Sequence, residues 1–435
     1  MKRFISSLCV AALGALASAG LVFAQPAEEH LQVIHAGHLI AVPGERVRNG
    51  ASIIIRNGRI ESIEDGYVTR DGAEIVDLTS HWVLPGLIDA HVHLLSERGA
   101  NSRLDPFTLS SADRAFVGAR HARRTLEAGF TTVQDVGGDL EAILALRNAI
   151  RNGDAVGPRM RVAGPSITPT GGHGDVNGYN QRVIENFSSP GACNGPSDCA
   201  RAVRSLIQAG VDTIKITATG GVLSNTAAGI EVQFMDDELR AIVQAAEMMG
   251  RRVTAHAHGV TGVNAFLAAG GHSIEHGTFL DNESIRLFRS SGAFLVPTVM
   301  AGEFVTLEAQ ANAPWMTPFQ RAKALQVGPQ MVDMLRRAHR GGVQIAFGTD
   351  SGVSRHGDNA REFELMVEAG MTPEQAIIAA TINGARHLQM EGEIGRIAPG
   401  FHADIIAVSG NPLENISELR DVDFVMAAGM VHKAP

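Results

Sequence analysis

Cysteine, aromatic residues and clusters of basic residues are scarce in this 435-residue sequence. It has three cysteines, 5% aromatic residues and a formal net charge of -9, and Lys and Arg form no cluster after the first residues. The lack of a basic cluster gives no support to nucleic-acid binding. The lack of a second cysteine pair argues against a zinc site built from cysteines. Glycine is abundant, at 48 residues, which suits many tight connections between strands and helices.

The N-terminus has the composition of a targeting segment. Lys2 and Arg3 precede an apolar stretch over residues 8–23, and Val22-Phe23-Ala24 offers a cleavage point. Because the stretch is short and rich in alanine, it favours a signal peptide over residues 1–24 against a membrane anchor. The sequence therefore predicts a secreted, periplasmic protein with no stable membrane anchor.

Removal of the signal peptide leaves two cysteines in the mature chain. Cys193 and Cys199 are six residues apart in one loop, whereas Cys9 leaves with the signal. In an oxidising compartment, a disulfide that ties this loop is expected in preference to two free thiols.

The pattern of elements changes near residue 84. Before it the chain alternates short β segments, and Asn57-Gly58 is a strong hairpin-turn signal. After it, strands alternate with helices. The candidate strands are residues 83–91, 131–135, 160–163, 212–217, 252–256, 272–276, 294–297 and 344–350. Eight such units match an α/β fold of the (β/α)8 TIM-like barrel type, with a doubly wound sheet as the alternative.

The C-terminal tail returns to β character, with candidate strands at residues 405–408 and 422–427. We expect this tail to complete the N-terminal sheet. The predicted domains are the barrel over residues 84–389 and a small β-sandwich built from residues 25–83 together with 390–435.

Residues that can bind a metal ion stand at five of the candidate strands. Barrel enzymes build their sites at the carboxyl ends of the strands, so we expect these side chains to converge. His91 and His93 lie two residues apart and therefore project to the same side of their strand. The full set is His91, His93, Lys215, His256, His276 and Asp350.

At these residues the sequence resembles the amidohydrolase superfamily. The resemblance covers nearly the whole mature chain and extends to the branch of two-zinc dipeptidases related to Xaa-Pro dipeptidases, which also contains ochratoxin-cleaving amidohydrolases. The motifs that carry it are Leu84-Pro-Gly-Leu-Ile-Asp-Ala-His-Val-His93, Ile214-Lys215-Ile216, Ser273-Ile-Glu-His-Gly277, Gly348-Thr-Asp-Ser-Gly352 and Gly395-Arg-Ile-Ala-Pro-Gly-Phe-His-Ala-Asp404.

The resemblance implies two Zn²⁺ ions, with other divalent metals as alternatives, and Lys215 N-carboxylated by CO₂ so that it bridges them. A lysine buried near cations has a lowered pKa, so that its neutral amine can attack CO₂. The alternative is a core lysine that reaches out to solvent. The implied ligands are His91, His93 and Asp350 for one ion and His256 and His276 for the other.

The same resemblance gives Asp350 a catalytic role. Zinc lowers the pKa of a bound water from about 15.7 to about 7, which supplies a nucleophile at neutral pH. Asp350 would accept the proton of the attacking water and deliver it to the leaving amine.

Three further residues are candidates for binding the substrate. His173 lies in the glycine-rich loop Thr170-Gly-Gly-His-Gly-Asp175, with a solvated loop histidine as the alternative. His258 stands where relatives often carry a tyrosine that contacts the substrate carboxylate; alternatively, His258 is the metal ligand in place of His256. Arg355, with the neighbouring His356, is placed to meet an anionic end of the substrate, with a plain surface loop as the alternative.

Two acidic residues lie at strand ends. Glu275 is assigned to packing, and the role of Asp135 is left open. Glu275 precedes His276, and strand alternation would point it the opposite way, into core or interface packing. Asp135 ends the second strand, where packing and catalysis are both acceptable interpretations.

The predicted activity is hydrolysis of the amide bond of dipeptides or N-acyl amino acids that have a free C-terminal carboxylate. Xaa-Pro dipeptides and acyl-phenylalanine amides are the examples that the resemblance implies. The alternative is a lactonase or an imidazolonepropionase-like cyclic amide hydrolase, although Lys215 argues against the latter.

Three further expectations concern other functions and the assembly. A deaminase is disfavoured because Gly259 follows His258 where a catalytic Glu would stand. A binding protein that has lost activity is disfavoured because all six candidate ligands are present. Relatives commonly form symmetric assemblies, so a homo-oligomer is expected.

Overall fold

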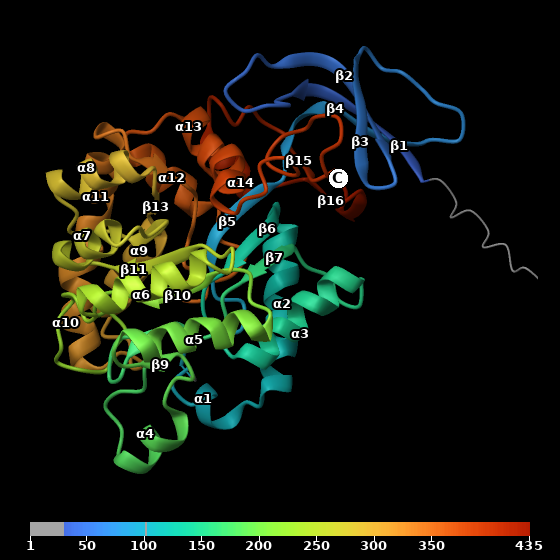
Figure 1. Ribbon diagram of the computed structural model, residues 1–435. Coiled ribbons are helices and arrows are strands. Elements are labelled where there is room, and N and C mark those ends of the chain that lie inside the picture. The colour runs from blue at the N-terminus through green and yellow to red at the C-terminus, as the bar shows by residue number, and fades with distance from the viewer. Residues whose placement is uncertain (1–29, 101) are drawn as a thin grey trace, which may run out of the picture.

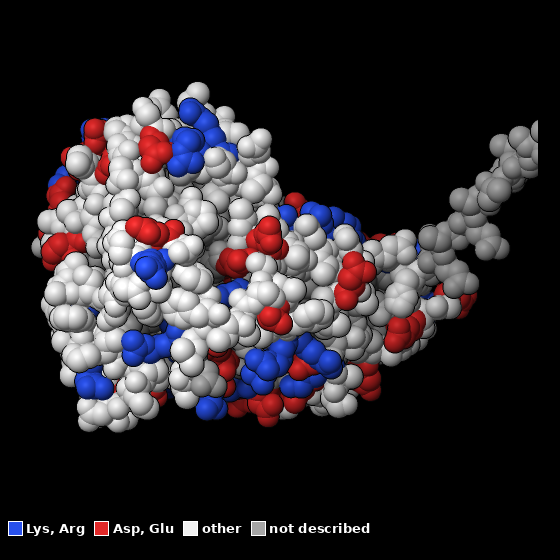
Figure 2. Space-filling view, turned by 90° about the horizontal axis from the view of Figure 1, so that it is seen from below, with Lys and Arg blue, Asp and Glu red and all other residues white. Residues whose placement is uncertain are grey.

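The structure is a computed structural model that describes residues 30–100 and 102–435 (Figure 1). The predicted signal peptide, residues 1–24, lies outside the described residues. Within them, no helix is long and apolar enough to cross a membrane. On the face shown in Figure 2, acidic and basic side chains are interspersed.

Both ends of the chain contribute to one seven-stranded sheet, whose order is β17-β16-β15-β4-β1-β2-β3. Its strands are β1 (Leu31–Leu39), β2 (Arg48–Arg56), β3 (Arg59–Asp65), β4 (Glu74–Pro85), β15 (Ile405–Val408), β16 (Phe424–Ala427) and β17 (Met430–Lys433). The ends of the chain meet where β15 pairs antiparallel with β4. The tail therefore completes the N-terminal sheet, as expected, while two separate sandwich layers and the exact domain limits stay predictions.

The expected hairpin is confirmed at Asn57-Gly58, which joins β2 to β3. Both residues have positive φ, 50° and 75°, as a type I′ turn requires.

The rest of the chain is an α/β arrangement of the TIM-barrel type, with parallel strands in two arcs. One arc holds β5 (Leu87–Val92), β6 (Phe130–Asp135) and β7 (Arg159–Val162). The other holds β10 (Ile214–Thr217), β11 (Val253–Ala257), β12 (Ser273–His276), β13 (Phe294–Val296) and β14 (Gln344–Ile345). The strands lie in sequential order, which excludes the reversed order of a doubly wound sheet.

Backbone hydrogen bonds link the two arcs at both of their edges. On one side the amide of Asp212 donates to Val162 O over 2.8 Å, and the amide of Ile167 donates to Lys215 O over 2.8 Å. On the other side Ala90 donates to Phe347 O over 2.9 Å, and His93 donates to Ser351 O over 2.7 Å.

Helices surround these strands (Figure 1). The longer ones are α2 (Ser111–Glu127), α3 (Leu140–Asn152), α5 (Pro196–Ala209), α6 (Asp236–Glu247), α7 (Val260–Ala268), α8 (Asn282–Ser291), α9 (Val299–Gln310), α10 (Pro318–Val327), α11 (Met331–Arg340) and α12 (Arg361–Glu368). The shorter ones are α1 (Asp105–Thr108), α4 (Gln181–Phe187), α13 (Pro373–Ile378) and α14 (Gly384–His387). A large apolar core fills the space between helices and strands.

The first predicted strand, residues 83–91, is in fact divided between two sheets. β4 ends at Pro85 and β5 begins at Leu87. Gly86 separates them, and a Cβ at this position would lie 2.1 Å from Thr131 Oγ1, so the close packing requires glycine.

Candidate metal centre and active site

The carboxyl ends of the parallel strands open into one cavity of about 930 Å³. The sequence predicted this convergence, and the structure brings nearly all the candidate residues together. The candidates that line the cavity are His91, His93, His173, Lys215, His256, His258, His276 and Asp350.

Two of these residues reach the cavity through unusual backbone conformations. His276 has φ 74° and Asp350 has φ 57°, both in the left-handed region. Side chains other than glycine rarely adopt this conformation, which costs about 1–3 kcal/mol. Each residue therefore leaves the strand alternation at the point where its side chain enters the site.

Asp350 joins the two histidines of β5. Its Oδ1 lies 3.4 Å from His91 Nε2 and 3.3 Å from His93 Nε2. This oxygen is buried and, among the residues that the structure describes, has no hydrogen-bond partner. Burial raises the pKa of Asp350, but His91 and His93 outweigh it and hold the pKa well below its usual range. A buried carboxylate oxygen that faces two imidazole nitrogens is a donor set that fits a divalent metal ion.

The second group consists of imidazoles from β11 and the segment that follows it, and from β12. One ring nitrogen from each of His256, His258 and His276 lies within 4.8 Å of the others. Burial lowers the pKa of His258 to about 3 and those of His256 and His276 well below the ordinary value. The three imidazoles are therefore neutral and available as ligands. Both His256 and His258 belong to this group, so both assignments of the strand-five ligand stay open.

Hydrogen bonds determine which ring nitrogen of each histidine is free to bind metal. Thr298 Oγ1 donates to Pro297 O, so it must accept from His276 Nδ1, 2.6 Å away, and His276 Nε2 carries the free lone pair. His93 Nδ1 lies 3.1 Å from Gly137 O, which leaves its Nε2 free in the same way. His256 is reversed, because its Nε2 faces Gly220 O at 3.3 Å and its Nδ1 is the free nitrogen.

Lys215 lines the same cavity as these histidines, and its side chain is buried. The expected alternative, a core lysine that reaches solvent, is therefore wrong. Burial lowers the pKa of Lys215, against the charges of Glu275, Asp350 and Asp135. A lowered pKa increases the fraction of neutral amine, which is the form that carboxylation requires.

The expected core packing of Glu275 is confirmed by its complete burial, but the direction expected for its side chain is wrong. Its carboxylate is fully buried, accepts from His91 Nδ1 over 2.6 Å and also contacts Thr254 Oγ1. Strand alternation placed Glu275 opposite His276, but the left-handed backbone at His276 brings both side chains inward. Glu275 therefore orients His91 and leaves His91 Nε2 towards Asp350.

Asp135 supports the backbone beside the site. It accepts from the amide of Leu94 over 2.7 Å and from that of Gly137 over 3.3 Å. Burial raises its pKa to about 6. These contacts favour the packing interpretation of Asp135.

His173 lies against the imidazole group and not in a solvated loop. Its ring centroid is 4.2 Å from that of His256, and its Nδ1 lies 2.6 Å from Ser224 Oγ. Burial lowers the pKa of His173 to about 3, so the ring is neutral. One ring nitrogen is bonded to Ser224, and the role of His173 in substrate binding stays a prediction.

The structure does not bring Arg355 to the cavity, and its assignment to substrate binding stays a prediction. Its side chain is exposed and does not line the cavity. Between Asp350 and Arg355 the chain passes through Gly352, where φ is 117°. His356 is buried elsewhere: it stacks on His121 and bonds Ser96 O over 2.9 Å.

Sequence reasoning missed Arg98, which lines the cavity. It follows His93 by five residues, in the connection after β5. Its position at the carboxyl end of a parallel strand was a signal that could have identified it.

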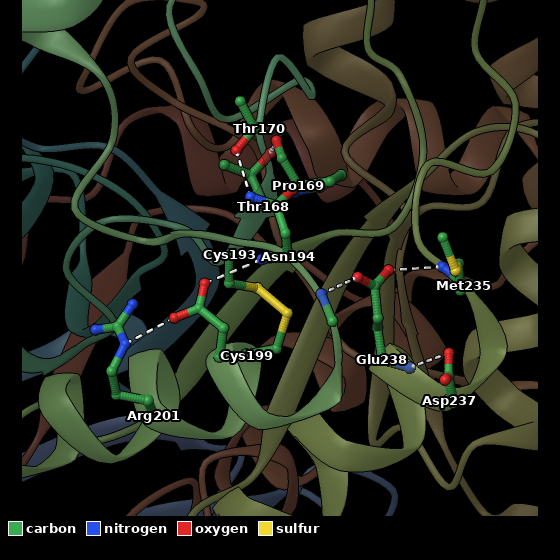
Figure 3. Close-up of a disulfide and its surroundings, with 12 residues drawn as sticks. Thr168, Pro169, Thr170, Cys193, Asn194, Cys199, Arg201, Met235, Asp237 and Glu238 are labelled. Atoms are coloured by element: carbon green, nitrogen blue, oxygen red, sulfur yellow. Dashed lines mark hydrogen bonds and ion pairs between the residues drawn. A yellow bond between two sulfur atoms is a disulfide. The ribbon is translucent and has the colours of Figure 1, made fainter.

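Cys193 and Cys199 form a disulfide at the start of α5 (Figure 3). Cys193 ends β9 (Ala192–Cys193), which pairs with β8 (Thr168–Pro169) just before the loop that carries His173. Glu238 accepts from the amide of Gly195 over 2.6 Å and anchors the same segment to α6. The disulfide therefore braces the base of the His173 loop.

Comparison with known proteins relates this site to characterised hydrolases. The model of the amidohydrolase family matches residues 82–431. Ochratoxinase from Aspergillus niger is 31% identical, over 95% of this chain and 89% of its own. A solved Xaa-Pro dipeptidase with methionine bound in its active site is 41% identical, covers 93% of this chain and 100% of its own, and superposes with a TM-score of 0.89. A prolidase in complex with N-methylphosphonate-L-proline is 30% identical, with coverage of 93% and 100% and a TM-score of 0.85.

Proposed function

The chain belongs to the amidohydrolase family, and from this membership we propose that it is a two-zinc hydrolase of dipeptides or N-acyl amino acids. Its relatives place it in the dipeptidase-like branch, among hydrolases that act on carbon–nitrogen amide bonds. The finer proposal is a substrate with a free C-terminal carboxylate, as in Xaa-Pro dipeptides or acyl-phenylalanine amides.

The observation that carries this proposal is the buried Oδ1 of Asp350, which faces two imidazole nitrogens and has no hydrogen-bond donor among the described residues. His91, His93 and Asp350 would hold one ion. His276, with His256 or His258, would hold the other, and Lys215, carboxylated by CO₂, would supply further oxygen ligands. Bound zinc would supply an activated water and polarise the scissile carbonyl.

The residues of the chain then have distinct tasks. Asp350 accepts the proton of the attacking water and passes it to the departing amine, a general acid–base role. Glu275 and Thr298 hold the rings of His91 and His276 in orientation. The free nitrogen of His173 binds the substrate carbonyl or carboxylate.

We further propose that residues 1–24 are removed as a signal peptide, that the mature enzyme is periplasmic, and that it works as a homo-oligomer. The first two proposals rest on the sequence, and the third rests on the symmetric assemblies that relatives commonly form.

The test is a measurement of zinc content together with a substrate panel. Purified protein should hold about two zinc ions per chain and should cleave Xaa-Pro, Xaa-Arg or acyl-phenylalanine substrates. Capping the carboxylate as an amide should abolish cleavage. Turnover of lactones or cyclic amides with no amidase activity would replace this proposal by the lactonase alternative.

A further inference from the structure

The cavity is lined by three Lys or Arg side chains of the described chain: Arg98, Arg114 and Lys215. Lys215 lies among the metal ligands. Arg114 donates from Nη2 to the carbonyl of Asp105 over 3.1 Å. The guanidinium of Arg98 has no hydrogen bond or ion pair within residues 30–100 and 102–435. Of the two arginines that line the cavity, Arg98 is therefore the one whose whole guanidinium is available to an anionic ligand.

The backbone of Arg98 is hydrogen-bonded to the segment that follows the candidate ligand Asp350, although its side chain makes no hydrogen bond to the described residues. Its amide donates over 2.8 Å to the carbonyl of Gly352, two residues after Asp350. The ionisable groups close enough to act on its guanidinium are Asp350, Asp105 and Tyr179. Arg98 thus lies within electrostatic range of the candidate ligand Asp350 and of Tyr179.

Tyr179 belongs to a small aromatic cluster between α1 and α4, which lie side by side at one end of the molecule in Figure 1. The ring of Phe107 meets Tyr179 edge-on at 5.5 Å and Phe187 at 5.0 Å. The three rings are 40%, 38% and 43% exposed, and Phe187 lines the cavity. An exposed aromatic cluster that continues into a cavity offers an apolar binding surface to what the cavity holds.

We propose that Arg98 binds the carboxylate of the substrate, and that the Phe107–Tyr179–Phe187 cluster receives the side chain of the same residue. The proposal rests on the proposed amide hydrolysis and narrows its substrate class to N-acyl amino acids and dipeptides whose C-terminal residue is large and apolar. A guanidinium suits this task because it binds a carboxylate with two parallel hydrogen bonds. The ring of His258, by contrast, already bonds Thr278 Oγ1 over 2.9 Å.

The first experiment tests whether the positive charge of Arg98 binds the substrate carboxylate, and it separates this effect from any effect of the substitution on folding. Zinc-loaded wild type, Arg98→Met and Arg98→Lys are compared on N-acetyl-L-phenylalanine and on its C-terminal amide. Arg103→Met is the matched control, because Arg103 lies in the same connection, is exposed and does not line the cavity. We expect Arg98→Met to lower kcat/KM for the free acid roughly 10- to 100-fold, mainly through KM, and to leave the residual rate on the amide unchanged. The kcat/KM of Arg98→Lys for the free acid should lie between those of wild type and Arg98→Met. The kcat/KM of Arg103→Met should match that of wild type.

The second experiment tests the aromatic cluster. Phe187→Ala should lower kcat/KM for acyl-phenylalanine roughly 10-fold and leave acyl-alanine unchanged, since only the larger side chain reaches the cluster. Phe116→Ala is the control, because Phe116 is 80% exposed on α2 and does not line the cavity. An equal loss on both substrates would overturn this half of the proposal.

A binding measurement distinguishes failure of this inference from failure of the proposed function. Calorimetry compares L-phenylalanine with L-phenylalaninamide on the zinc-loaded proteins, which requires no turnover. Tighter binding of the acid by wild type, lost in Arg98→Met, supports the carboxylate site even if no amide is cleaved. Active wild type with an undiminished preference for the acid in Arg98→Met overturns the inference and leaves the function standing. Equal affinity of wild type for acid and amide also overturns it.

Discussion

The two halves of the candidate metal centre are supported by different chemistry. In the carboxylate-supported half (His91, His93 and Asp350), Glu275 bonds His91 Nδ1 over 2.6 Å and Asp350 faces both histidines. In the hydroxyl-supported half (His256, His258 and His276), Thr298 and Thr278 bond the rings of His276 and His258 over 2.6 and 2.9 Å.

This difference changes the proton affinity of the ligands. Burial lowers the pKa of His91, but Asp350 and Glu275 outweigh it and the pKa is raised overall. In the hydroxyl-supported half no carboxylate of residues 30–100 or 102–435 bonds the rings, and all three imidazole pKa values are lowered. We therefore expect the carboxylate-supported half to bind metal more tightly, and the other half to leave its ion more electron-poor, as polarisation of a carbonyl requires.

The largest effect is expected from Asp350→Asn, which removes the proton acceptor of the carboxylate-supported half. General acid–base catalysis contributes about 10²–10⁴-fold, so kcat should fall by about 10³-fold. Steady-state kinetics of the zinc-loaded variant measure this loss. Glu141→Gln is the control, because Glu141 is an exposed carboxylate that lines the same cavity. A variant that keeps a tenth of wild-type kcat would remove Asp350 from catalysis.

The next largest effect concerns the identity of the strand-five ligand. His256→Asn should lower the zinc content from about two ions to about one per chain, measured by elemental analysis after dialysis. His258→Asn should keep both ions and alter KM. The opposite pattern would assign the hydroxyl-supported half to His258 and free His256 for the substrate.

Much of this centre was predictable from sequence because its ligands stand at strand ends. Apolar runs and the alternation of side chains predicted six ligand candidates, and all six line one cavity. What could not be predicted depends on backbone conformation. The left-handed residues His276 and Asp350 break the alternation, and for that reason the direction of Glu275 was wrong.

Loop residues show the same limit. Arg355 and Arg98 both follow strands whose ends line the site, and sequence reasoning chose Arg355. Arg355 does not line the cavity, whereas the connection after β5 keeps Arg98 on it. The path of a loop depends on contacts that are distant in sequence, and composition does not encode it locally.

Glu275→Gln tests whether the carboxylate of Glu275 makes the carboxylate-supported half bind metal more tightly than the hydroxyl-supported half. Replacing a carboxylate that bonds a ligand histidine typically costs 10–100-fold in metal affinity, and zinc affinity by competition with a chelator should fall within that range. Glu362→Gln is the control: its carboxylate is also fully buried but bonds the amides of Val299 and Met300. Unchanged zinc affinity in Glu275→Gln would remove the distinction between the two halves.

The hydroxyl-supported half should give the metal-free protein a measurable pH dependence. His258 is buried, with a pKa of about 3 against 6.5 for an ordinary histidine. Between these values the unfolded chain binds the proton and the folded chain does not, so stability is lost as the pH falls below 6.5. The slope is about 1.4 kcal/mol per pH unit for each such histidine. Urea unfolding of the metal-free protein at pH 6.5 and 5.5 should show it, with a shallower slope in His258→Asn. An equal slope in both proteins would assign the dependence to other groups.

The smallest effect is expected from Thr298→Val. This substitution removes a hydrogen bond between His276 and a neutral hydroxyl, whereas Glu275→Gln removes a charged partner of His91. The substitution keeps the β-branched shape at a residue whose φ is 49°, so the backbone strain is unchanged. The hydroxyl makes two neutral hydrogen bonds, to His276 and to Pro297 O, and only the first bears on the metal ligand. Its loss costs about 1 kcal/mol, which corresponds to a zinc affinity a few-fold weaker, less than for Glu275→Gln. Thr278→Val provides the parallel case on His258, and chelator competition measures both. If Thr298→Val costs as much as Glu275→Gln, then orientation of the ring and not the charge of its partner determines metal affinity, and the two halves are equivalent.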